Sequence, residues 1–173
     1  MSSLTLRQLN ALPAAEFVAR LGGVFEHSAW VAQGVASQRP FDSIDALHQA
    51  MTACVQTASP QAQLQLIRAH PELAGKAAVR GELTEHSTRE QAGAGLDQCS
   101  EQEYKALTQL NRQYLDKFGF PFILAVRGYD RAGIIAQMQR RLANDVDQEQ
   151  NESLRQIYQI ARYRLDDIFS DLE

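Results

Sequence analysis

The chain has 173 residues, of which 45% are hydrophobic and 22% charged, and its formal net charge is −4. A chain of this length is expected to form one domain, spanning 1–173, and to bury its core without disulfides or a structural metal. The composition excludes a disordered protein, and the weakly acidic balance gives no electrostatic reason to bind nucleic acid or an anionic membrane surface.

In the first half of the chain, apolar residues recur at helical spacing, and proline, glycine and capping residues set the boundaries. Pro13 marks the start of one helix, and Ser59-Pro60 combines a capping serine with a proline suited to the first helical position. The sequence predicts four helices here, at 13–21, 28–36, 44–55 and 60–70.

The second half predicts four further helices. Residues 75–84 have no clear period and are expected to be irregular. Ser100 and Glu103 have the spacing of a capping box and open a long helix that Gly119 ends. The expected helices cover about 84–97, 100–118, 131–142 and 147–168.

Residues 120–126, FPFILAV, break the helical period. The stretch is continuously apolar, partly β-branched and contains a proline, so it is expected to be extended and largely buried. With so little extended structure, the predicted class is all-α: a single-domain, irregular bundle of about eight helices with one extended apolar segment.

His70 ends a predicted helix and is followed by Pro71, which fixes the backbone after it. Histidine is suited to proton transfer because its ordinary pKa lies near neutrality. A histidine at a helix C-terminus also interacts favourably with the helix dipole, so a purely structural role is the alternative.

The stretch STREQ, 87–91, allows two interpretations. The helix that contains it begins at Thr84 or at Ser87, and Ser87 and Glu90 have capping-box spacing, which would explain both residues structurally. Alternatively, the free amides of a helix N-terminus attract an anion, with Glu90 and Gln91 directed toward a ligand.

Arg164 lies within the apolar stripe of the last predicted helix, which also contains Leu154, Ile157 and Leu165. A buried guanidinium keeps its charge and needs anionic or carbonyl partners. Its partner is a structural carboxylate, Glu90 or a carboxylate on a substrate; the other alternative is an arginine at the edge of the stripe that reaches water.

No nucleotide-binding loop, nucleophile elbow or cysteine pair at metal spacing is present in the sequence. His86 and Glu90 lie four residues apart on a helix, but no third ligand has suitable spacing, so a zinc site is not expected. If the chain is an enzyme, we expect it to work without a cofactor.

Three segments together resemble one family: HPELAGK (70–76), LTxxSTREQAxAGL (83–96) and NxxYxxKFGFPFILAVR (111–127). The family is 2-oxo-4-hydroxy-4-carboxy-5-ureidoimidazoline (OHCU) decarboxylase, of uric acid degradation. The resemblance extends over nearly the whole chain, including RxLxN at 140–144 and IARYRLDDI at 160–168. It implies an all-helical, cofactor-free homodimer that converts OHCU to S-allantoin and carbon dioxide.

The resemblance also implies site residues, position by position. The family's catalytic residues fall on His70, Glu90 and Arg164. Its substrate-binding residues fall on Pro71, Ser87, Thr88, Arg89, Glu90, Gln91, Phe122, Ile123, Leu124, Ala125 and Val126. His70 is expected to donate or shuttle the proton, and Glu90 to orient His70 or the ureido nitrogens.

Two other functions compete with the decarboxylase. One is a helical module that binds a ureide or purine-like ligand without chemistry, and the other is a metal hydrolase that uses His70, His86 and Glu90. The sequence has neither a basic, apolar leader nor an apolar run long enough to span a membrane, so a cytoplasmic protein is expected.

Overall fold

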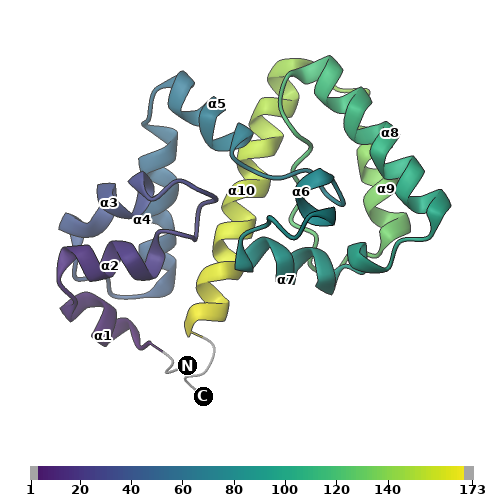
Figure 1. Cartoon of the computed structure of the whole chain (residues 1–173). Coiled ribbons are helices and arrows are strands. Elements are labelled where there is room, and N and C mark those ends of the chain that lie inside the picture. Colours follow the sequence, from purple (N-terminus) through teal and green to yellow (C-terminus); the bar gives the residue numbers. More distant parts are fainter. Residues whose placement is uncertain (1–3, 170–173) are drawn as a thin grey trace. The chain divides into compact units, whose positions relative to one another are not determined.

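The computed structural model describes residues 4–169, so the first three and last four residues of the predicted 1–173 domain lie outside the described part. Within 4–169 the chain forms ten α-helices, two short 3₁₀ helices and no strand (Figure 1). The prediction of an all-α fold is confirmed. The α-helices are α1 (Leu6–Ala11), α2 (Ala14–Leu21), α3 (Trp30–Val35), α4 (Ile44–Gln56), α5 (Pro60–Arg68), α6 (Lys76–Val79), α7 (Glu85–Gly93), α8 (Glu101–Phe118), α9 (Arg131–Arg141) and α10 (Val146–Phe169).

The eight helices expected from the sequence are all present, and two short ones, α1 and α6, were missed. Helix α1 begins with a capping box in which the Gln8 amide donates to Thr5 Oγ1 and the Thr5 amide donates to Gln8 Oε1. The pattern T-x-x-Q is therefore the signal that could have predicted α1. Helix α6 has four residues and lies in the stretch that has no period.

The chain divides into two compact units. In the described part, 4–66 and 158–169 form the first unit, and 67–157 form the second. Helix α10 contributes its first half to the second unit and its second half to the first. The expectation of a single domain over 1–173 stays a prediction.

In the first unit, α3 packs against α2 and α4, and the three helices lie side by side in Figure 1. Ser43 caps α4 by accepting a hydrogen bond from the Ala46 amide. The apolar residues of α4 recur at helical spacing and therefore share one face. This buried face carries Leu47, Met51 and Val55.

In the second unit, α8 packs against α9. The capping box of Ser100 and Glu103 is present, and Gly119 ends α8 in the left-handed conformation at φ +78°, as predicted. Aromatic rings of α8 and the following segment then pack together, with Tyr114 at the centre of contacts to Phe118, Phe120 and Phe122.

Residues 120–126 contain neither helix nor strand, and every one of them is buried, which confirms the predicted extended apolar segment. Over the described residues, none of the helices combines the length and the apolar character that a membrane crossing requires.

Substitutions at two glycines distinguish the stability cost of a left-handed backbone from that of the low helix propensity of glycine. An added Cβ at Gly119 meets little, the nearest atom being Arg68 Nη2 at 3.9 Å, so Gly119→Ala is expected to lose about 1–2 kcal/mol of stability through backbone strain alone. Gly93, the last residue of α7, has nothing within 4 Å of such a Cβ, so Gly93→Ala is expected to gain up to about 0.5–1 kcal/mol. Urea unfolding of both variants measures the two changes, and the same sign for both would contradict the assignment.

Candidate functional site

His70 lies at the start of an irregular loop, 70–75, that leaves the end of α5. The imidazole is buried, with 7% of the residue exposed, and Pro71 after it is half-buried. At the far end of the loop, Ala74 adopts a left-handed conformation at φ +51°, which costs a non-glycine residue about 1–2 kcal/mol. The surrounding structure must therefore hold this loop in place.

Two side-chain amides hold the loop. Gln91, on α7, accepts a hydrogen bond from the Ala74 amide at 2.9 Å through Oε1 and donates to the Glu72 carbonyl at 3.3 Å through Nε2. Asn111, on α8, donates to the Leu73 carbonyl at 2.9 Å. The loop that carries His70 is thus fixed to both α7 and α8.

Thr84, not Ser87, is the N-cap residue of α7, and the helix itself begins at Glu85. Thr84 Oγ1 accepts from the Ser87 amide at 3.2 Å, so Ser87 is the third residue of the helix and Glu90 lies one turn further in. The capping-box interpretation of Ser87 and Glu90 was therefore wrong.

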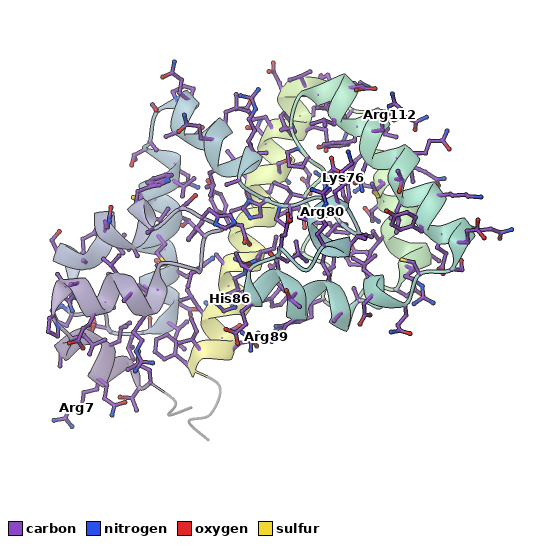
Figure 2. The ribbon with its side chains drawn as sticks, viewed as in Figure 1. Arg7, Lys76, Arg80, His86, Arg89 and Arg112 are labelled. Carbon is purple, nitrogen blue, oxygen red and sulfur yellow. The ribbon has the colours of Figure 1, made fainter. Side chains whose placement is uncertain are left out.

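The predicted site residues of α7 separate into two faces. Ser87, Glu90 and Gln91 are spaced three and four residues apart and share one face, on which Ser87 and Gln91 are buried and Glu90 is half-buried. Thr88 and Arg89 are exposed; Thr88 Oγ1 donates to the Thr84 carbonyl, and Arg89 Nη2 lies 3.3 Å from His86 Nδ1 (Figure 2). The structure thus brings Ser87, Glu90 and Gln91 together on the face from which Gln91 reaches the 70–75 loop.

The extended segment 122–126 is anchored by side chains, not by another backbone. Arg141 Nη1 donates to the Ile123 carbonyl at 2.5 Å, and the Ala125 amide donates to Gln156 Oε1 at 2.9 Å. Within 4–169, the amides of four residues in this buried segment have no hydrogen-bond partner: Phe122, Ile123, Leu124 and Val126. Buried N–H groups are paired almost without exception in folded proteins, so these four are candidates for binding a ligand.

Arg141 is itself held by a buried polar network that the sequence did not reveal. Its guanidinium pairs with Glu149 at 2.8 Å, with only 1% and 0% of the two side chains exposed. Glu149 also accepts from Tyr114 Oη at 2.5 Å and from Asn144 Nδ2 at 2.9 Å. Burial, and then the hydrogen bond to Glu149, raise the pKa of Tyr114, so its hydroxyl remains a donor.

In the first unit, Arg164 is buried, with 2% of the residue exposed, so the alternative of an arginine that reaches water was wrong. Its Nη2 lies 2.8 Å from Glu26 Oε2, and its Nη1 donates to the Gly23 carbonyl at 3.0 Å. The carboxylate that was expected to balance this guanidinium is therefore present as Glu26, which sequence reasoning missed. The expected pairing of Arg164 with Glu90 stays a prediction.

Two of the surface hollows within the second unit have volumes of about 550 and 730 Å³. Of the predicted site residues, Thr88 and Gln91 line the smaller one, and the larger one lies by Lys76 and Arg112 (Figure 2). Over residues 4–169, no group of three or more His, Cys, Asp or Glu side chains is placed to hold a metal ion.

A sequence model described as OHCU decarboxylase matches residues 10–166 of the chain. The 2-oxo-4-hydroxy-4-carboxy-5-ureidoimidazoline decarboxylase of Haloferax volcanii is 42% identical over 170 residues, which cover 98% of this chain and 99% of that protein. The uric acid degradation bifunctional protein of Bacillus sp. strain TB-90 is 41% identical over 170 residues, but these cover 33% of its length.

Two solved structures are similar. A crystal structure of (S)-allantoin synthase is 31% identical, with a TM-score of 0.77 over 95% of this chain and 54% of that chain. A crystal structure of OHCU decarboxylase in the presence of (S)-allantoin is 22% identical, with a TM-score of 0.69 over 90% of this chain and 98% of that one, and it shows the same fold.

The Gln91 contacts predict how the 70–75 loop is stabilised. Gln91→Leu removes the acceptor of the buried Ala74 amide, which is expected to destabilise the loop by about 1–3 kcal/mol and to accelerate hydrogen exchange at Ala74 at least about tenfold. Gln91→Glu keeps the acceptor and is the matched control. Exchange at Ala74 that is equal in the Leu variant and the wild type would show that Gln91 does not hold the loop.

Proposed function

The chain belongs to the OHCU decarboxylase family, and from this we propose that it converts OHCU to S-allantoin and carbon dioxide in the degradation of uric acid. The family model covers both compact units, and the similar proteins include one named for OHCU decarboxylation over nearly its full length. The chain is accordingly a carboxy-lyase.

The observation that supports the proposed chemistry most directly is the backbone of 122–126. Four amides of this buried segment have no hydrogen-bond partner within 4–169, and the side chains of the segment itself are apolar. Amides fixed in a dry environment stabilise negative charge on a ligand more strongly than water does, and they need no reorganisation during the reaction. We propose that amides of this segment bind the ring oxygens of OHCU.

The chemistry of OHCU explains why such a site needs an oxyanion-binding backbone and a proton donor. The carbon that carries the carboxylate adjoins the ring C=N bond. When the bond to the carboxylate breaks, its electron pair forms a C=C bond, and the C=N pair moves to nitrogen, which is protonated. The hydroxyl then loses its proton and becomes the carbonyl of allantoin, while the ureido-bearing carbon takes up a proton on one face. The net reaction releases carbon dioxide and consumes one proton.

We assign the catalytic roles to three residues. His70 is the proton donor or shuttle, because its imidazole is held by a fixed loop and buried away from bulk water. Glu90 orients His70 or the ureido nitrogens. Arg164 binds a polar group of the substrate, and the Glu26 carboxylate holds its guanidinium.

The remaining family positions are proposed to bind the substrate. Ser87 and Gln91 contact the ureido arm, and Pro71 lines the site beside His70. Thr88 and Arg89 are also proposed to bind the substrate, although both residues are exposed in this structure. The apolar side chains of 122–126 form a dry wall, which favours the loss of a charged carboxylate as neutral carbon dioxide.

The resemblance further leads us to propose a homodimer, a cytoplasmic location, a reaction without a cofactor, and one functional domain over 1–173. The match of a single family model across both compact units supports the last of these. Gel filtration with light scattering tests the dimer.

His70→Ala is expected to keep the fold and to lower the enzymatic rate by about 10²- to 10⁴-fold, because general acid–base groups contribute about that much. The assay adds freshly generated OHCU and follows the circular dichroism of S-allantoin, since OHCU also decays without an enzyme. His48→Ala is the matched control, because His48 bonds the Tyr158 carbonyl within the first unit and has no proposed catalytic role. Full stereospecific turnover by His70→Ala would remove His70 from the mechanism, and a wild type that binds allantoin without turnover would indicate a binding module.

A further inference from the structure

One side chain from α9 and one from α10 bind the backbone of 122–126, at Ile123 and at Ala125. Arg141 binds the carbonyl of Ile123 and Gln156 binds the amide of Ala125. In an extended chain, the backbone groups of alternate residues point to the same edge. Ile123 and Ala125 therefore share the edge that faces Arg141 and Gln156.

The opposite edge of the same segment carries the backbone groups of Phe122, Leu124 and Val126. Within the described residues, none of these three amides has a hydrogen-bond partner, although the Val126 carbonyl accepts from the Tyr129 amide at 2.9 Å. The Ala125 amide, in contrast, is already bonded to Gln156 and is not available to a substrate. The Ile123 amide also has no hydrogen-bond partner within the described residues, but it lies on the edge that faces Arg141 and Gln156. The proposed substrate-binding donors are therefore the amides of alternate residues only.

We propose that Arg141 and Gln156 are positioning residues, which hold one edge of 122–126 so that the amides of Phe122, Leu124 and Val126 face the substrate. This inference rests on the proposed role of 122–126 in binding OHCU. It assigns a function in the reaction to two side chains outside the predicted site residues.

Both positioning residues are themselves fixed. Arg141 is held by its ion pair with Glu149. Its guanidinium also lies over the Phe122 ring, 4.4 Å from the centroid, so Arg141 contacts both this ring and the Ile123 carbonyl next to it. The Gln156 amide is oriented because its Nε2 donates to Glu152 Oε1 at 2.9 Å, which leaves Oε1 directed at Ala125. If Arg141 or Gln156 moved away from 122–126, it would also lose its contact with Glu149 or Glu152.

The test uses Gln156, because this residue is half-buried and its replacement is expected to destabilise the fold less than replacement of the buried Arg141. Gln156→Leu removes the acceptor and leaves the Ala125 amide free. The rescue variant combines Glu152→Gln with Gln156→Glu, which conserves total charge, keeps an acceptor for Ala125 and keeps the bond between the two side chains. Both are measured for kcat and KM with OHCU and for thermal unfolding.

We expect kcat/KM of Gln156→Leu to fall about 10- to 100-fold, mainly through kcat, because misplaced donors weaken binding of the transition state more than binding of the ground state. The rescue variant should recover to within about threefold of the wild type. A Gln156→Leu enzyme that matches the wild type in kcat and KM overturns the inference, as does an equal loss in both variants. A wild type that shows no turnover would overturn the proposed function instead.

Arg141 gives a second comparison. Arg141→Lys keeps the positive charge but lacks the planar guanidinium that bonds both Ile123 and Glu149. Arg140→Lys is the control, because Arg140 is exposed and its side chain bonds Gln137. If the protein remains folded, kcat should fall at least about tenfold for the first variant and stay unchanged for the second. Equal kcat values in the two folded variants would contradict a positioning role for Arg141.

Discussion

The structure depends on how an extended, buried backbone is kept in one conformation without a neighbouring strand. Residues 122–126 have no ladder of backbone hydrogen bonds, so their carbonyls and amides must be bonded by side chains or by a ligand. The Arg141–Glu149 ion pair provides the central anchor at the Ile123 carbonyl. Removing one partner of such a pair costs about 3–5 kcal/mol, because the other charge then remains buried and unpaired.

The same solution recurs at the loop that carries His70. There, too, irregular backbone is held by side chains from helices, with Gln91 and Asn111 in place of Gln156 and Arg141. Helices supply rigid positions for these side chains, while the loop and the extended segment supply the backbone groups and the imidazole. In the proposed site, this arrangement combines a proton donor with oxyanion-binding amides.

Local features of this fold could be predicted from the sequence, and long-range pairings could not. The break in helical period at 120–126 follows from a local pattern, and the structure confirms it. The position of Arg164 within an apolar stripe left two alternatives open, and the structure shows that the residue is buried. Glu26 is separated from Arg164 by 138 residues, so no spacing rule could select it among the carboxylates of the chain. Glu149 was missed for a different reason, because acidic residues near a helix start are ordinarily solvated.

Binding of the product to crystals of this protein is the most direct test of the account. In a crystal structure with S-allantoin, we expect ligand oxygens to lie about 3 Å from amides of Phe122, Leu124 or Val126, with the His70 imidazole also in contact with the ligand and Ala125 still bonded to Gln156. S-allantoin that lies in the hollow beside Lys76 and Arg112 instead, with no contact to 122–126, would contradict the claim that this backbone forms the active site.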